Sequence, residues 1–373
     1  MDGTRPEFPV EPGVLETAAA GVFSPEAFGY VAGSAGTEST ARANRAAFDR
    51  WRIVPRFLRD VSVRDLSTTV LGTAMPAPIV LAPVGVQGIV HPDAELAVAR
   101  AAAALRVPFT LSTVSSYRLE DVVEAAGDSP RWFQLYWPRD PDVAASLLGR
   151  ARAAGFTTLV LTLDTFSLAW RPRDLAAAYL PFLQRLGLAN YESDPAFLAG
   201  LERSPDDDPT SSILRWLSMF GDPSKTWDDL PWLREHWDGP IVLKGVLHPD
   251  DARRAADAGM DGVVVSNHGG RQVDGSIASL EALPDVVTAV GDRIEVLFDS
   301  GVRTGSDVVK AIALGARAVL VGRPYVYGLG LGGEAGVRHV LRSLLAELDL
   351  AMALSGCASV ADIDSRLLKA IRE

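Results

Sequence analysis

The chain has 373 residues, 48% of them hydrophobic, and a formal net charge of −11 at pH 7. A hydrophobic fraction of this size supports a large core, and α/β barrels commonly exceed about 250 residues as one domain. The acidic balance argues against nucleic acid and anionic membranes as partners, which favour basic surfaces, but not against a small anionic substrate.

Cys357 is the only cysteine, which excludes an intramolecular disulfide and a cysteine metal cluster. The first residues, MDGTRPEFPVEPG, lack the basic and apolar segments of a signal peptide. No stretch approaches the roughly 20 apolar residues of a membrane span. We therefore expect a cytoplasmic protein without a metal or a membrane partner.

Residues 1–77 precede the first predicted strand and are expected to form an N-terminal helical segment, with helices near residues 25–31 and 38–51. Beyond them, eight short runs are apolar and rich in β-branched residues, as in strands buried on both faces of a parallel sheet. The runs are residues 78–85, 108–114, 131–137, 158–164, 240–246, 262–268, 295–302 and 318–324.

Helix signals lie between these runs. Asp140-Pro141 is a typical helix start, and Gly155, Gly259 and Gly315 are placed to end helices just before strands. The segments AAGFTTLVLT, DAGMDGVVVS and ALGARAVLVG resemble one another as a weak repeat of helix, glycine and strand. The pattern predicts one α/β domain over residues 1–373, a (β/α)8 TIM barrel.

Two segments depart from the repeat. Residues 175–227 form a long insertion after the fourth strand, and its apolar stretch LPFLQRLGLANY indicates that part of it closes over the active site. Residues 328–333 match G-x-G-x-x-G but do not follow directly on a strand that opens a βαβ unit. We interpret this match as a loop before the last helices, not as a nucleotide-binding motif.

Polar residues interrupt the apolar runs at their carboxyl ends, where barrel enzymes carry their catalytic groups. The glycines and cations after the last two runs are typical of the barrel phosphate site, which predicts a phosphorylated ligand. These residues are Gly301, Arg303, Gly322 and Arg323.

His268 follows the sixth run and precedes two glycines. Asp164 is a candidate carboxylate to orient it and raise its basicity, which predicts a general base. Arg171 and Arg271 match the geometry of a substrate carboxylate, although each could instead pair with a protein acid, such as Asp174 for Arg171.

Lys244, at the end of the fifth run, has four interpretations. It could form a Schiff base, bind phosphate, stabilise negative charge on a cofactor, or belong to a buried ion pair. Its residue type and position alone do not choose among them.

These residues together resemble the FMN-dependent 2-hydroxy-acid oxidase and dehydrogenase family over nearly the whole chain. The motifs that carry the resemblance are Ala82-Pro-Val-Gly85, Phe133-Gln-Leu-Tyr136, Leu163-Asp-Thr165, Leu243-Lys-Gly245, Ser266-Asn-His-Gly-Gly-Arg-Gln272, Phe298-Asp-Ser-Gly-Val-Arg303 and Val321-Gly-Arg-Pro324. Within the family the chain is most similar to lactate 2-monooxygenase. That similarity lies in Tyr30-Val-Ala-Gly33, Trp170-Arg-Pro-Arg-Asp174, the insertion with Pro181-Phe-Leu183 and Asn190-Tyr191, and Leu247-His-Pro-Asp-Asp-Ala-Arg-Arg254.

The resemblance implies a role for each matching residue. His268 would take the hydroxyl proton while hydride passes to flavin N5, and Asp164 would stabilise the imidazolium. Arg171, Arg271 and Tyr30 would bind the substrate carboxylate, Tyr136 its hydroxyl, and Lys244 the negative edge of reduced flavin. The implied contacts of FMN are Pro83, Val84, Gly85, Ser112, Gln134, Thr162, Lys244, Ser266, His268, Arg271, Asp299, Gly301, Arg303, Gly322 and Arg323.

The implied reaction is oxidation of an L-2-hydroxy acid, with O2 as acceptor. Release of the 2-oxo acid with H2O2 and oxidative decarboxylation in the site are both compatible with the sequence, because the outcome depends on product release. A non-redox FMN barrel such as an isomerase, and a flavin-binding protein without turnover, are the alternatives of other classes. The resemblance also implies a homo-oligomer, a tetramer or an octamer.

The chain departs from the lactate enzyme at Phe166, Ser167 and Leu168, which we expect beside the substrate side chain. Gly85 stands where many members have alanine, and we expect it to leave more room near the flavin. The native substrate could therefore be larger than lactate.

Overall fold

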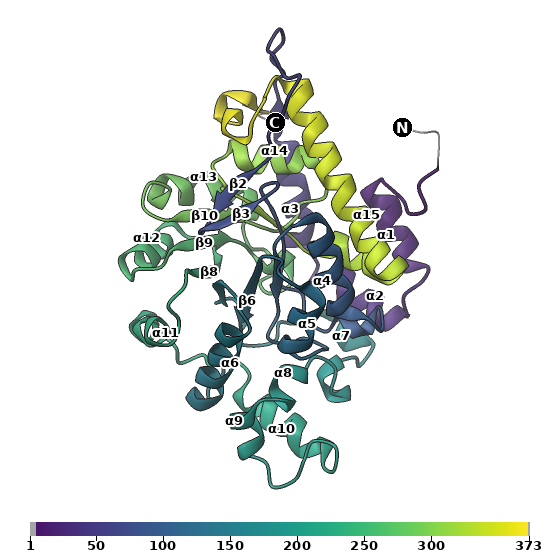
Figure 1. Cartoon of the computed structure of the whole chain (residues 1–373), viewed down its shortest axis with the longest axis vertical. Coiled ribbons are helices and arrows are strands. Elements are labelled where there is room, and N and C mark those ends of the chain that lie inside the picture. The colour runs from purple at the N-terminus through teal and green to yellow at the C-terminus, as the bar shows by residue number, and fades with distance from the viewer. Residues whose placement is uncertain (1–4, 372–373) are drawn as a thin grey trace.

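The computed structural model describes residues 5–371. Its centre is a closed barrel of eight parallel strands surrounded by helices, as the sequence predicts (Figure 1). In chain order the strands are β4 (Ile79–Leu81), β5 (Phe109–Leu111), β6 (Arg131–Leu135), β7 (Thr158–Thr162), β8 (Ile241–Val246), β9 (Gly262–Val265), β10 (Glu295–Phe298) and β11 (Val319–Val321). Most end before the apolar runs do, so most of the polar residues at the run ends lie in the loops that follow the strands.

The barrel helices follow their strands. They are α4 (Ala94–Leu105), α5 (Leu119–Ala126), α6 (Pro141–Ala153), α11 (Leu230–His236), α12 (Pro249–Asp257), α13 (Ser279–Val290), α14 (Gly305–Ala313) and α15 (Arg323–Ser355). Asp140 caps α6 by accepting hydrogen bonds from the N–H groups of Asp142 and Val143, as its place before Pro141 predicts. Gly155, Gly259 and Gly315 have φ of 77°, 72° and 106°, a backbone that favours glycine and ends each helix.

The N-terminal segment is helical only in its first part. It contains α1 (Pro12–Ala20), α2 (Pro25–Ala32) and α3 (Ser39–Asp49), of which α2 and α3 are predicted. After them β1 (Trp51–Ile53) pairs with β12 (Leu368–Ala370) near the other end of the chain, and β2 (Thr68–Val70) forms a hairpin with β3 (Thr73–Met75). The expectation of helix throughout residues 1–77 is wrong in this second part, because these strands pair with partners that local pattern does not reveal.

The hairpin of β2 and β3 closes the amino end of the barrel. Val70, Leu71 and Met75 pack in one cluster with the inward-facing residues of the strands, and the indole N–H of Trp132 donates to Oγ1 of Thr73 at 3.1 Å. Because this end is sealed by apolar packing, the opposite, carboxyl end is the one left for a ligand.

Residues 328–333 lie inside α15 and are not a loop, so that prediction is wrong. The helix is interrupted only at Gly332 and Gly333. A Cβ on Gly336 would lie 1.9 Å from the carbonyl oxygen of Gly328, and one on Gly330 would lie 2.0 Å from the ring of Phe23. The glycines therefore serve close packing within the final helix and against the N-terminal segment.

The insertion is folded into short helices. They are α7 (Pro172–Ala176), the 3-10 turn Pro181–Gln184, α8 (Ala189–Glu192), α9 (Pro195–Ala199) and α10 (Pro209–Met219). Of these, α8, α9 and α10 form a lobe at one end of the molecule, whereas α7 lies beside α2 (Figure 1). Within residues 5–371, we find no helix with both the length and the apolar character needed to cross a membrane.

Candidate active site

A cavity opens at the carboxyl end of the barrel, with an empty volume of about 1060 Å³ that includes some open solvent. The predicted site residues that line it are Tyr30, Pro83, Val84, Gly85, Tyr136, Arg171, Lys244, His268, Arg271, Asp299, Gly301, Arg303, Gly322 and Arg323. Asp164, Ser112, Gln134, Thr162 and Ser266 do not line it, although Asp164 bonds to His268 and Ser266 bonds to Lys244, which do.

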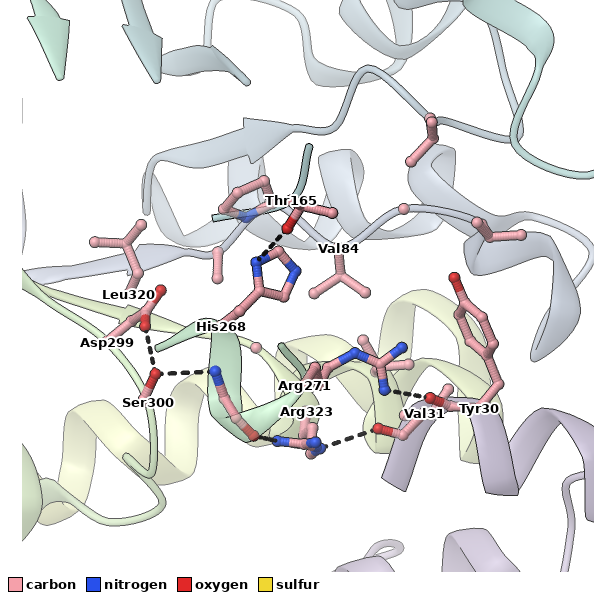
Figure 2. Close-up of a pocket in the computed structure, with 18 of the residues that line it drawn as sticks. Tyr30, Val31, Val84, Thr165, His268, Arg271, Asp299, Ser300, Leu320 and Arg323 are labelled. Atoms are coloured by element: carbon pink, nitrogen blue, oxygen red, sulfur yellow. Dashed lines mark hydrogen bonds between the residues drawn. The ribbon is translucent and has the colours of Figure 1, made fainter. Parts of the chain in front are cut away.

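His268 begins the 3-10 turn His268–Gly270 that follows β9, and its ring points into the cavity (Figure 2). Its Nδ1 lies 2.9 Å from Oδ1 of Asp164 and 3.2 Å from Oγ1 of Thr165. A carboxylate that accepts a hydrogen bond from Nδ1 fixes the neutral tautomer, which leaves the lone pair of Nε2 free to accept a proton.

Electrostatics favour the neutral imidazole. Burial lowers the pKa of His268 below its ordinary value, and the positive charges of Lys244 and Arg171 add to this effect, while Asp164 opposes it. Burial would raise the pKa of Asp164, but the neighbouring His268 and Lys244 outweigh it and hold that pKa below its ordinary value. The pair therefore combines a free base with an ionised carboxylate behind it.

Two further contacts position this pair. Gly245 has φ of 106°, and a Cβ on it would lie 2.9 Å from the carboxyl group of Asp164. On the other side, the amides of Asn44 and Asn267 exchange two hydrogen bonds of 2.8 Å, although 223 residues separate them in the sequence. Helix α3 thus anchors the turn that carries His268.

The two arginines expected to bind a carboxylate lie together. Nε of Arg171 donates to the carbonyl oxygen of Arg271 at 3.1 Å, and the Arg271 guanidinium lies 5.0 Å from the ring centroid of Tyr30. Arg171 is 3.9 Å from Asp174, whereas Arg271 has no salt bridge within residues 5–371. Burial and the adjacent Arg171 lower the pKa of Arg271 to about 9. Arg271 is half-buried, and Asp174 lies near it without forming a salt bridge, so an unpaired guanidinium at this place favours an anionic ligand over a structural ion pair.

A second pair of cations, Arg303 and Arg323, lies next to the first, because Arg323 and Arg271 both donate to the carbonyl oxygen of Gly33, at 2.8 and 2.9 Å. Burial and the mutual repulsion of the two groups lower the pKa of Arg303 to about 10, and burial also lowers that of Arg323. In the described part of the chain neither forms a salt bridge. Arg323 donates to the carbonyl oxygens of Val31, Gly33 and Gly269, which connects α2 to the His268 turn (Figure 2). The Arg303 guanidinium has one hydrogen bond, to the carbonyl oxygen of Val302.

Lys244 belongs to a buried cluster on the cavity floor. Its Nζ lies 3.1 Å from Oδ2 of Asp299 and donates to Oγ of Ser266 at 3.0 Å. Burial would lower the pKa of Lys244, but Asp299 and Asp164 outweigh it and raise the pKa above its ordinary value. Of the open interpretations, the charged form in an ion pair fits this geometry, and the neutral amine of a Schiff base does not.

Ser112, Gln134 and Thr162 form a chain of hydrogen bonds across three neighbouring strands. Oγ of Ser112 donates to Oε1 of Gln134 at 3.0 Å, and Nε2 of Gln134 donates to Oγ1 of Thr162 at 3.1 Å. All three side chains are buried. This arrangement fixes the amide of Gln134 beneath the cavity.

Several lining residues have no predicted role of their own, among them Val114, Thr165, Phe220 and Ser300. Phe182 also lines the cavity, and it belongs to the apolar stretch LPFLQRLGLANY that is expected to close over the site. Phe182 and Phe220 come from the two ends of the insertion, and only the tertiary fold brings them together. The additional room expected beside Gly85 is filled by Val114, because a Cβ on Gly85 would lie 2.4 Å from Cγ2 of that residue.

Backbone strain gathers at the cavity. Val86, His268 and Ser300 line it and have φ of 58°, 56° and 80°, a region that residues with a side chain rarely adopt. Such conformations persist where the surrounding structure enforces them, and they cluster at functional sites.

Residues 19–370 match the model of the family described as FMN-dependent dehydrogenase. The chain is 49% identical to an FMN-dependent alpha-hydroxy acid dehydrogenase of Penicillium citrinum over 99% of this chain and 94% of that protein. It is 45% identical to an L-lactate oxidase of Lysinibacillus sphaericus, over 95% and 91% of the two chains. Among solved structures, mandelate oxidase with (S)-4-hydroxymandelic acid is similar, with 41% identity, a TM-score of 0.86 and coverage of 97% and 98%. The chain therefore belongs to the FMN-dependent dehydrogenase family, and its cofactor is FMN.

Proposed function

We propose that this protein oxidises L-2-hydroxy acids with an apolar side chain larger than methyl to 2-oxo acids, with O2 as the final electron acceptor. One observation carries the proposal: the imidazole of His268 and the guanidinium of Arg271, which forms no salt bridge within residues 5–371, face the same cavity (Figure 2). A base beside a carboxylate site is what removal of a proton from a 2-hydroxy acid requires.

The residues present fit FMN. Arg303 and Arg323 are half-buried cations at the loops after the last two strands, where barrels bind phosphate. The Lys244–Asp299 pair offers a buried cation for a negative ring edge and a carboxylate for hydroxyl groups. The amide of Gln134, with Ser112 and Thr162, offers hydrogen bonds to a polar ring. These residues would hold the cofactor, which supplies the acceptor for the hydride that leaves Cα of the substrate.

The chain's own residues do the remaining work. Arg171 and Arg271 bind the substrate carboxylate, with Tyr30 beside them, and so orient Cα. Nε2 of His268 accepts the proton of the substrate hydroxyl, and Asp164 stabilises the imidazolium that results. Burial raises the pKa of Tyr136 far above its ordinary value, so this phenol stays protonated and donates a hydrogen bond to the substrate oxygen.

The apolar part of the lining favours a large side chain on the substrate. Phe182, Phe220, Leu168 and Val114 line the cavity together with the ring of Tyr136, whose centroid lies 5.4 Å from that of Phe220. Burial of an apolar side chain against such a wall is favourable by roughly 25 cal/mol per Å². A methyl group leaves most of this wall without contact.

Anaerobic mixing of the holoenzyme with a graded series of 2-hydroxy acids tests the proposal. We expect loss of the oxidised flavin absorption, faster with larger apolar side chains. If no acid bleaches the flavin, the oxidation is refuted in favour of a non-redox FMN barrel or a flavin-binding protein without turnover.

Oxidative decarboxylation is the second candidate, and the position of the insertion favours it. Phe182 and Phe220 are lining residues from the insertion. A lid formed by residues 175–227 would retain the 2-oxo acid until peroxide attacks it. The products are then the acid shortened by one carbon, CO2 and water. Stoichiometric H2O2 and 2-oxo acid under air would reject this outcome and retain the simple oxidase.

A further inference from the structure

Two loops form one wall of the cavity, and we refer to residues 83–88 and 112–116 as the wall loops. Val84, Gly85 and Val86 of the first and Val114 of the second line the cavity. The loops bond directly: the N–H of Val86 donates to the carbonyl oxygen of Val114 at 2.9 Å, and the N–H of Gly88 donates to Oγ of Ser116 at 2.9 Å. The two loops therefore form one continuous wall.

The first wall loop is strained at Val86. This residue is buried and β-branched, yet its φ of 58° lies in the left-handed region. A β-branched residue rarely adopts this conformation unless neighbouring contacts enforce it. The next residue, Gln87, supplies such a contact through its backbone N–H.

That contact is made by Glu95, in the first turn of α4. Its Oε1 accepts hydrogen bonds from the N–H of Gln87 at 3.2 Å and from the N–H of Ser116 at 3.1 Å, one in each wall loop. The residue is 2% exposed, and its Oε2 has no hydrogen-bond partner in the structure. No salt bridge reaches it from elsewhere in residues 5–371. The ionisable group that faces it from α15 is Tyr325, whose hydroxyl donates to the carbonyl oxygen of Ala82.

We propose that Glu95 is a positioning residue, whose ionised carboxylate holds the two wall loops together beside the flavin and whose protonation loosens them. A carboxylate accepts N–H bonds more strongly than a neutral carboxylic acid does. Protonation would therefore weaken both bonds at once and release part of the constraint on Val86. The mechanism proposed above makes no use of Glu95, and this inference depends on FMN binding alone.

Burial raises the pKa of Glu95 to about 7, although the N–H groups of Ser116 and Gln87 oppose this rise. A carboxyl whose pKa is higher in the folded than in the unfolded chain binds more protons when folded between pH 4.5 and 7. The contribution of this group to the free energy of unfolding therefore falls as pH rises through that window. Ionised Glu95 lowers the stability of the fold, so stability alone does not explain why a glutamate stands at this position.

The test compares the wild-type holoenzyme with Glu95→Gln, which resembles the protonated carboxyl in charge. The control is Glu295→Gln, because Glu295 also accepts from a backbone N–H, that of Leu71, and also has an oxygen without a partner, but lies at the closed end of the barrel. The flavin absorption and circular dichroism spectra and the Kd for FMN are measured from pH 5.5 to 8.5, with the Tm at each pH.

We expect the wild type to show a spectral transition near pH 7 and to bind FMN about fivefold or more weakly at the acidic end, the lower limit of typical coupling between sites. Glu95→Gln should show the acidic spectrum at every pH, with a Tm at pH 8 equal to or above that of the wild type. Glu295→Gln should keep the transition. A wild-type spectrum without a transition, or a transition retained in Glu95→Gln, overturns the proposal. A Glu95→Gln protein that does not fold, or whose Tm falls at pH 8 with an unchanged spectrum, assigns Glu95 to fold stability and also overturns it.

Discussion

Gly85 and Val114 compete for the same space: a Cβ on Gly85 would lie 2.4 Å from Cγ2 of Val114 and 2.7 Å from its carbonyl oxygen. Gly85→Ala should therefore overpack this wall of the cavity and cost about 1–3 kcal/mol of stability. It should also slow flavin reduction by 2-hydroxy acids, because Val114 is displaced toward the substrate. Thermal unfolding and anaerobic stopped-flow reduction measure the two effects.

Val114→Ala in the Gly85→Ala background should restore part of both losses. Full restoration is not expected, since the carbonyl oxygen of Val114 remains close. The control is Gly149→Ala in α6, where an added Cβ meets nothing within 4 Å and should stabilise the helix by about 1 kcal/mol. Additive effects of the Gly85 and Val114 substitutions would show that the two residues do not share this space.

Flavin reduction should depend on the protonation of His268. Because burial, Lys244 and Arg171 lower the pKa of His268, the neutral base should persist through neutral pH. The rate of reduction should rise with pH through an apparent pKa below 6.5 and then stay level. Anaerobic reduction rates from pH 5 to 8 measure this profile.

His268→Gln should retain FMN but lower the rate of reduction by about 10²–10⁴-fold, the usual contribution of a general base. His248→Gln is the control, since His248 lies on the exposed start of α12. An unchanged rate of flavin reduction in the His268 variant would refute the assignment of His268 as the base, but not the assignment of the FMN site.

The sequence predicts the barrel well because each strand and helix carries its own local signal. Eight β-branched apolar runs and glycines such as Gly155 reveal the repeat without any tertiary information. The polar residues at the run ends reach one cavity because parallel strands present their carboxyl ends together.

Other features depend on contacts that local pattern does not encode. The pairing of β1 with β12 and the amide pair of Asn44 and Asn267 join segments hundreds of residues apart. Phe182 and Phe220 are ordinary apolar residues of an irregular insertion until the fold places them in the cavity. Gly85 is recognisable as an unusual position, but only the structure shows that Val114 fills the space beside it.

The arginine pair should be specific for carboxylates. Arg271→Lys should weaken binding of 2-hydroxy acids by about 10–100-fold, because hydrogen bonds to charged groups contribute roughly 1.5–3 kcal/mol and lysine lacks the planar fork. FMN affinity should change less. Titration of the flavin spectrum with a non-reducing analogue, such as the 2-oxo acid, measures the Kd.

Arg173→Lys is the matched control. Arg173 lies two residues from Arg171 but bonds to Glu38 at the half-exposed rim, so its replacement should leave the affinity for acids nearly unchanged. Equal affinities of wild type and Arg271→Lys would show that the carboxylate binds elsewhere.

The wall formed by Phe220 should set the preference for the substrate side chain. Its ring lies 4.8 Å from Trp216 and 5.4 Å from Tyr136, centroid to centroid, so the scaffold behind it remains when the phenyl group is removed. Phe220→Ala should weaken binding of 2-hydroxy-2-phenylacetate by roughly 3–10-fold, as expected for loss of an aromatic contact, with a smaller effect on lactate. Leu214→Ala on α10, the helix that ends just before Phe220, is the control, because Leu214 is 60% exposed and does not line the cavity. Anaerobic reduction at a range of acid concentrations gives the Kd of each acid in the three proteins. A loss of equal size for both acids would mean that Phe220 supports the whole site instead of contacting the side chain, and would remove the reason for assigning a large apolar substrate.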